Sequence, residues 1–114
     1  MKIYYNSRCS KCRIAKIFLE DNNIKFEVIG YLEIGITKED IRNILRNGKL
    51  NVLDIVRKNE EEYKLYIRDK NLSEEEIINL ICKYPRLLQR PIIFDNQKAI
   101  VARDEESLNK VKEW

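Results

Sequence analysis

Two cysteines, Cys9 and Cys12, stand three residues apart in the stretch NSRCSKCRIAKIFLE, which begins at Asn6. A thiolate is both a nucleophile and a metal ligand, and two thiols at this spacing can form a disulfide. The pair therefore fits a redox couple, half of a metal site, or one reactive thiol beside a bystander. It also fits two ordinary small residues near a helix start.

The counts of cysteine and histidine narrow these choices. The chain has three cysteines and no histidine. A closed structural zinc site needs four Cys or His ligands, and an odd cysteine count argues against a framework of disulfides. We therefore expect neither a metal nor a bound cofactor. Because the commonest general base is absent, any chemistry must use thiolates, arginines, carboxylates and backbone dipoles.

The position of Cys9 favours a nucleophilic role. If a strand ends near Asn6 and a helix begins near Ser10, Cys9 lies where unpaired backbone N–H groups and the helix dipole stabilise an anion. We expect a lowered pKa for its thiol. The same backbone groups, around Ser10 and Lys11, can hold a tetrahedral oxyanion. Three side chains add positive charge nearby: Arg8, Lys11 and Arg13.

The other two cysteines have weaker claims on function. Cys12 would lie one helical turn beyond Cys9, within reach for a disulfide, so it is a candidate resolving thiol or a bystander. Cys82 falls on an apolar face with Ile77, Ile78 and Ile81, which is typical of a buried and inert thiol.

Bulk composition sets the class of protein. The 114 residues fit one domain, 1–114, and 44% hydrophobic residues are enough for a core. A net charge of +3 is too small to argue for nucleic acid. No apolar run approaches the roughly 18 residues of a membrane span, and MKIYYNSRC lacks the apolar centre of a signal peptide. We therefore expect a cytoplasmic protein that does not use a membrane.

The elements before residue 37 form a β-α-β unit. Residues 2–5 are short and β-rich, residues 10–23 have helical spacing, and residues 24–30 alternate with Ile24, Phe26 and Val28 as a second strand. Such crossovers are right-handed and join parallel strands.

The rest of the chain divides into a helical block and a β-β-α unit. Residues 37–84 open with a capping-box pattern at Thr37 and repeat it at Ser73, with one or two short helices between them. Residues 90–102 predict a hairpin, followed by a helix capped by Asp104. Without the helical insertion at about 37–84, this order is that of an α/β, thioredoxin-like fold.

Five segments, in order, carry a family resemblance: IYYNSRCSKCR, YLEIGITKEDI, VRKNEEEY, CKYPRLLQRPIIF and AIVARDEESL. Together they resemble the arsenate reductases of the thioredoxin-like, glutaredoxin-coupled type over nearly the whole chain. The resemblance implies the same fold, and an enzyme that reduces arsenate through an adduct on Cys9. It implies an electron donor that is glutathione, glutaredoxin or thioredoxin.

The resemblance also implies site residues. The nucleophile matches Cys9, and the arginine that follows the cysteine loop matches Arg13. The proline of RPI, Pro91, resembles the cis-proline that faces the cysteine loop in thioredoxin-like folds. The oxyanion-binding arginines match three positions: Arg57, Arg90 and Arg103.

Arginine suits this chemistry because arsenate is a dianion near neutral pH and the nucleophile is also an anion. Guanidinium groups offset that repulsion and bind oxygens in bidentate fashion. The plainer interpretation of Arg57, Arg90 and Arg103 is that they are solvated surface charges.

Two positions depart from the reductase pattern. Tyr5 stands where the family often has a histidine, and Cys12 stands where it often has a serine. The resulting CxxC resembles Spx-like regulators, which bind RNA polymerase and use CxxC as an oxidation switch. Two alternatives therefore stay open: an Spx-like redox-sensing regulator of transcription, and a general thiol–disulfide oxidoreductase.

Overall fold

A four-stranded mixed sheet forms the centre of the computed structural model, which describes residues 1–114. The strands are β1 (Lys2–Tyr4), β2 (Glu27–Ile29), β3 (Ile92–Phe94) and β4 (Ala99–Val101). Their order in the sheet is β2-β1-β3-β4. β1 runs parallel to β2 and antiparallel to β3, and β3 runs antiparallel to β4.

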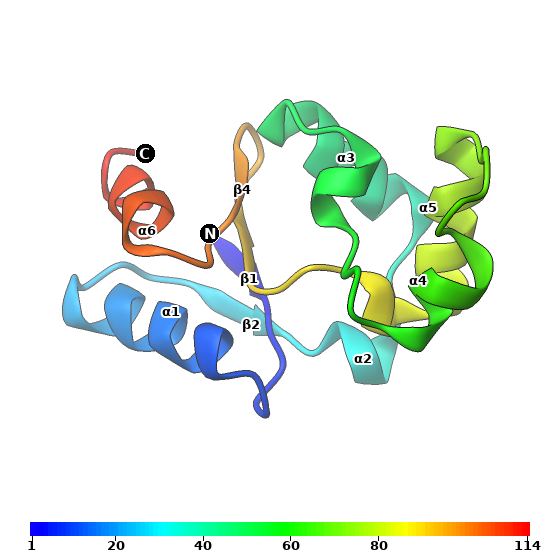
Figure 1. Ribbon diagram of the computed structural model, residues 1–114. Coiled ribbons are helices and arrows are strands. Elements are labelled where there is room, and N and C mark those ends of the chain that lie inside the picture. Colours follow the sequence, from blue (N-terminus) through cyan, green and yellow to red (C-terminus); the bar gives the residue numbers. More distant parts are fainter.

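Helices cover both faces of this sheet (Figure 1). They are α1 (Ser10–Asp21), α2 (Tyr31–Ile34), α3 (Lys38–Gly48), α4 (Glu61–Tyr66), α5 (Glu74–Lys83) and α6 (Glu105–Lys112), with 3-10 turns η1 (Val52–Ile55) and η2 (Pro85–Leu87). α1 and α6 lie on one side, and α3, α4 and α5 lie on the other. The predicted thioredoxin-like fold with a helical insertion is confirmed. None of the helices has both the length and the apolar character needed to cross a bilayer.

Side chains fix where the long helices begin. Thr37 Oγ1 accepts the backbone N–H of Asp40, and the Asp40 carboxylate accepts the backbone N–H of Thr37. Ser73 with Glu76 and Asp104 with Ser107 repeat this arrangement. These capping boxes satisfy N–H groups that the first helical turn leaves unpaired. All three predicted caps are therefore confirmed.

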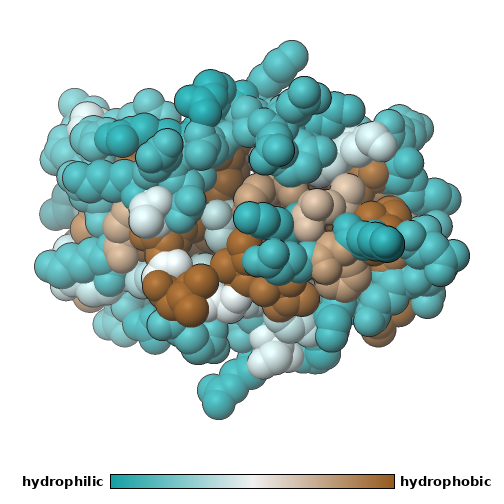
Figure 2. Space-filling model, turned by 180° about the vertical axis from the view of Figure 1, so that it is seen from behind, coloured by the Kyte–Doolittle hydropathy of each residue, from teal (hydrophilic) through white to brown (hydrophobic).

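The sheet separates two hydrophobic clusters. Ile3 of β1 faces α1 and α6 and packs with Leu19 and Leu108 in a cluster of 7 buried residues. The next residue, Tyr4, faces the other way into a cluster of 17 buried residues that includes the helical insertion. This alternation follows from the period of two along a strand. From behind, hydrophobic atoms gather across the middle of the molecule between hydrophilic margins (Figure 2).

Three details differ from the sequence expectations. The second strand covers only Glu27–Ile29 rather than residues 24–30, and Val28 is 42% exposed because β2 lies at the edge of the sheet. The short helix α2 follows this strand directly, where no helix was expected. Cys82 is partly exposed rather than fully buried.

The register brings four chain segments to one end of the sheet. Tyr4 lies opposite both Ile29 and Ile92, and Ile92 lies opposite Val101. The ends of β1, β2 and β4 therefore lie beside the start of β3. The segments that meet there are residues 5–9, 30–31, 90–91 and 102–103.

Candidate active site at the start of helix α1

A tight loop places Cys9 immediately before α1. Cys9 is the N-cap residue, with extended backbone angles of φ −92° and ψ 120°. Its N–H donates to the carbonyl of Asn6 at 3.0 Å, and its own carbonyl accepts the N–H of Arg13 at 3.1 Å. The guanidinium of Arg13 donates to the carbonyl of Ser7 at 2.9 Å. The loop is therefore closed on itself, and the first turn of the helix begins at the reactive thiol.

The surroundings of Cys9 favour its thiolate. Burial raises the pKa of its thiol, but the backbone N–H of Cys12, the Cys12 thiol and the Arg90 guanidinium act in the opposite direction and leave that pKa below its ordinary value. Hydrogen bonds and a positive charge stabilise the charged form. Cys9 is also partly exposed, whereas Cys12 is not. Cys9 therefore has the position and the electrostatics of a nucleophile.

Cys12 has the opposite character. It is completely buried on the inner face of α1. Burial is the main reason why the pKa of its thiol rises to about 12, and the neighbouring Cys9 thiolate raises it further. At neutral pH this thiol is therefore protonated and donates toward Cys9. Both cysteines are free thiols in the structure.

Arg90 and Pro91 face the cysteine loop from the start of β3. The peptide bond between them is cis, and the buried Pro91 accepts the N–H of Ala102 on its carbonyl at 3.0 Å. The positive charge of the Arg90 guanidinium lowers the pKa of both the Cys9 and the Cys12 thiol. The pairing of β1 with β3 brings Arg90 to the cysteine loop, because Ile92 lies opposite Tyr4.

The other two predicted arginines also come to this end of the sheet. Arg103 donates to the carbonyl of Arg90, so it is anchored to the neighbouring segment. The backbone of Arg57 is fixed in place, because its N–H donates to the carbonyl of Leu87 at 2.7 Å. Arg57 and Arg103 both line a pocket of about 420 Å³. An anion in that pocket would meet both guanidinium groups.

Glu60 is a site residue that motif reasoning missed. Its carboxylate accepts from Arg57 Nε at 3.1 Å, and both side chains are largely buried. Glu60 also lines a second pocket, of about 400 Å³, together with Arg90 and Arg8. The Arg57–Glu60 ion pair therefore lies between the two pockets. The (i, i+3) spacing of the two charges was the available signal.

Tyr31 is a second missed residue. It is fully buried, and its hydroxyl has no hydrogen-bond partner. Burial raises the pKa of its phenol, and the positive charges of Arg90 and Arg57 both oppose that rise. No sequence motif marks a buried tyrosine as part of a site.

Three of the predicted binding residues are less closely engaged. Ser10 is an exposed first residue of α1. Lys11 lines a separate groove between α1 and α6, of about 360 Å³, to which Arg103 also contributes. Arg13 supports the loop through Ser7. Their direct roles in binding stay predictions.

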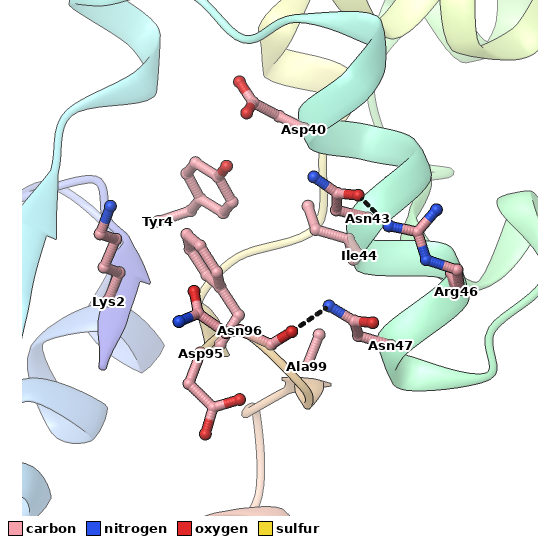
Figure 3. Close-up of a pocket in the computed structure, with 11 residues that line it drawn as sticks. Lys2, Tyr4, Asp40, Asn43, Ile44, Arg46, Asn47, Asp95, Asn96 and Ala99 are labelled. Carbon is pink, nitrogen blue, oxygen red and sulfur yellow. Dashed lines mark hydrogen bonds between the residues drawn. The ribbon is translucent and has the colours of Figure 1, made fainter.

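A pocket of about 340 Å³ lies elsewhere, between the β3–β4 turn and α3 (Figure 3). It contains no cysteine, and two pairs of its polar residues are bonded to each other. Arg46 bonds to Asn43, and Asn47 Nδ2 donates to the carbonyl of Asn96 at 3.5 Å. Nowhere in the chain do three or more His, Cys, Asp or Glu side chains group as metal ligands would.

Comparison with known proteins shows the family. The model of the ArsC family matches residues 4–111. The chain is 35% identical over 113 residues to the uncharacterized protein YfgD of Escherichia coli (strain K12), covering 97% of this chain and 95% of the relative. It is 34% identical over 113 residues to an arsenate reductase of Neisseria meningitidis serogroup A, covering 97% of each chain.

Solved structures and a second group of relatives agree. An arsenate reductase from Vibrio cholerae superposes with a TM-score of 0.85 at 33% identity, covering 99% of this chain and 97% of that one. The global transcriptional regulator Spx 2 of Bacillus anthracis is 28% identical over 109 residues, covering 95% of this chain and 83% of the relative. The chain belongs to the ArsC family, whose arsenate reductase-like members are related to the Spx regulators.

Proposed function

We propose that the protein reduces arsenate to arsenite, with Cys9 as the nucleophile. The observation that carries this proposal is the meeting, at one sheet end, of a partly exposed helix-start thiol and the guanidinium of Arg90. Arg103 donates to the carbonyl of Arg90 and lines one pocket together with Arg57. Relatives named arsenate reductase support the choice of oxyanion.

In the first step, the Cys9 thiolate attacks As(V) of arsenate. A sulfur–arsenic bond forms, and one arsenic–oxygen bond breaks as that oxygen takes up a proton and leaves as water. Two anions must approach each other, so guanidinium groups that grip the remaining oxygens lower the barrier. In this proposal Arg90, Arg57 and Arg103 supply that grip.

In the second step, a thiolate attacks the Cys9 sulfur. A disulfide forms, the sulfur–arsenic bond breaks, and arsenic keeps the electron pair and leaves as arsenite after taking up protons. The attacking thiol belongs to glutathione, with glutaredoxin then reducing the mixed disulfide, or it is Cys12, with a thioredoxin-like protein reducing the Cys9–Cys12 disulfide. A cytoplasmic location would keep both thiols reduced.

Burial of Cys12 bears on this choice. Its sulfur is shielded from solvent, and at neutral pH its thiol is protonated. The Cys12 sulfur can reach only the sulfur of Cys9. Before it attacks, the Cys12 thiol must lose its proton. An external thiol approaches from solvent and ionises near the ordinary thiol pKa, far more easily than Cys12, so we favour the glutathione route.

NADPH consumption in the presence of arsenate tests the proposal. Glutathione with glutaredoxin and thioredoxin with its reductase are compared for wild type, Cys9→Ser and Cys12→Ser, with Cys82→Ser as the matched control. We expect turnover with glutaredoxin that survives Cys12→Ser and disappears with Cys9→Ser. Turnover only with thioredoxin, lost in Cys12→Ser, would replace the first route with the second. Silence of wild type with both donors would overturn the proposed activity.

A second candidate function is redox-sensing regulation of transcription. The CxxC motif and the similarity to Spx regulators favour it. Its test is binding to the C-terminal domain of the RNA polymerase α-subunit, with the protein reduced and oxidised. Lack of binding in both states would exclude it.

A further inference from the structure

Tyr31 has a buried hydroxyl that the fold leaves without a partner. The residue is 0% exposed, at the start of α2, and no protein group hydrogen-bonds its Oη. Folded proteins pair nearly all buried polar groups, and an exception needs a reason. Nothing in the packing of α2 supplies one.

A second buried polar group without a partner belongs to Arg90. Its Nε is buried and also lacks a partner. The guanidinium acts on the Tyr31 hydroxyl and, on its other side, on the sulfur of Cys9. Two buried polar groups without partners therefore come from segments that the register brings to the end of the sheet where Cys9 lies.

An aromatic stack fixes the ring of Tyr31 there. Tyr4 meets it edge to face, with ring centroids 5.9 Å apart and an interplanar angle of 86°. Tyr4 itself stacks on Phe94 at 4.6 Å. Because β1 and β3 hold both of these residues, the ring of Tyr31 is packed against side chains of the sheet.

We propose that Tyr31 is a positioning residue: its hydroxyl and the Arg90 guanidinium, which carry unpaired atoms in the structure, bond to each other and so keep the guanidinium directed at the Cys9 sulfur. The inference rests on the proposed role of Cys9 as the reacting thiolate. A neutral phenol suits this task better than a carboxylate. A carboxylate would pair with Arg90 and compete with the thiolate for its charge, whereas a phenol offers a lone pair and no counter-charge.

The charge state of Tyr31 is consistent with this role. Burial raises the pKa of its phenol to about 12, despite the opposing influence of Arg90. The hydroxyl is therefore neutral wherever Cys9 is reactive. Two groups act on the Cys9 thiol, Cys12 of α1 and Arg90 before β3, and Tyr31 of α2 acts in turn on Arg90.

The test is the pH dependence of alkylation of Cys9 by iodoacetamide, followed by mass spectrometry of the Cys9 peptide. We expect Tyr31→Phe to shift this profile to higher pH by about half a unit, as Arg90 loses its fixed orientation. The matched control is Tyr4→Phe, which removes a hydroxyl from an equally buried tyrosine of the same stack. Tyr4 lies near Asp40 rather than Arg90, so its profile should match wild type.

A double-mutant cycle separates positioning from structure. In an Arg90→Gln background, Tyr31→Phe should cause no further shift of the profile. An equal shift in both backgrounds, a wild-type profile for Tyr31→Phe, or failure of Tyr31→Phe to fold would overturn the proposal. Alkylation needs no arsenate, so a shift in a protein that lacks arsenate turnover would disprove the proposed activity and leave the role of Tyr31 standing.

Discussion

The pocket of Figure 3 and the buried end of the sheet beside the start of α1 differ in how their polar groups are paired. In the pocket of Figure 3, Arg46 is bonded to Asn43, and Asn47 is bonded to the backbone of Asn96. At the start of α1, the hydroxyl of Tyr31 and the Nε of Arg90 are buried without partners. The first pocket therefore has two of its polar pairs bonded within the protein, whereas these two buried groups at the start of α1 have no partner.

The difference indicates where a ligand is expected. An unpaired buried polar group costs roughly 1–3 kcal/mol, so a fold that keeps two of them together is less stable than it need be. Functional sites often carry such a cost, because groups are placed there for chemistry rather than for stability. Polar groups that satisfy one another have no free capacity for a ligand. Mutations in these two places should therefore have very different effects.

The largest effect should come from the reacting atom. Cys9→Ser removes the one thiol of the CxxC motif that is partly exposed. We expect arsenate turnover to fall by at least about 10³-fold. The measurement is single-turnover formation of arsenite from arsenate and the reduced protein. Arsenite formation at the wild-type rate would mean that a different group reacts.

The next effect should come from Arg90. Arg90→Gln removes the charge that lowers the pKa of Cys9, so less thiolate is present at neutral pH. We expect kcat/KM for arsenate to fall by about 10²-fold and to recover partly as pH rises. An unchanged pH–rate profile would show that Arg90 does not stabilise the thiolate. The comparison would then lose its main support.

Arg57 sharpens the comparison because it is already paired. Its Nε bonds Glu60 at 3.1 Å, so an arriving oxyanion must share or replace that carboxylate. Arg57→Gln should raise KM about tenfold, whereas Glu60→Gln should lower KM or leave it unchanged. The readout is KM for arsenate at constant donor concentration. A higher KM in Glu60→Gln would show that the ion pair itself orients Arg57 for binding.

Cys12 gives a pH test within the same motif. Its pKa is higher in the folded than in the unfolded chain, so its contribution to stability is complete below the ordinary thiol pKa and is lost as pH rises toward about 12. Between pH 8 and 10, wild type should lose up to about 2 kcal/mol more unfolding free energy than Cys12→Ala. Urea unfolding at the two pH values measures this. Equal losses would mean that Cys12 ionises as easily in the folded chain.

The smallest effect should come from the pocket of Figure 3. Asn47→Ala removes one long hydrogen bond from a largely solvent-facing group. We expect a change in stability within about 0.5 kcal/mol and arsenate kinetics within twofold of wild type. A loss of activity comparable to that of Arg57→Gln would show that this pocket also serves the reaction.

Local rules were enough to predict much of this molecule. Capping boxes at Thr37, Ser73 and Asp104 and the strand–loop–helix around Cys9 follow from short-range chemistry, and each was predicted. The meeting of Arg90 with Cys9 depends on the register of β1 with β3, which no local pattern specifies. The family resemblance named that arginine. It did not name Tyr31, because the role of a buried tyrosine depends on which groups surround it.

The same register has a consequence for how the chain matures. The thiol of Cys9 and the guanidinium of Arg90 are 81 positions apart, and the pairing of β1 with β3, which sets Tyr4 opposite Ile92, brings them together. Before β3 docks against β1, Cys9 lacks that charge and is a more ordinary thiol. The rate at which Cys9 reacts therefore reports whether β3 has paired with β1. During synthesis we expect Cys9 to stay comparatively unreactive until β3 has been made and has paired with β1.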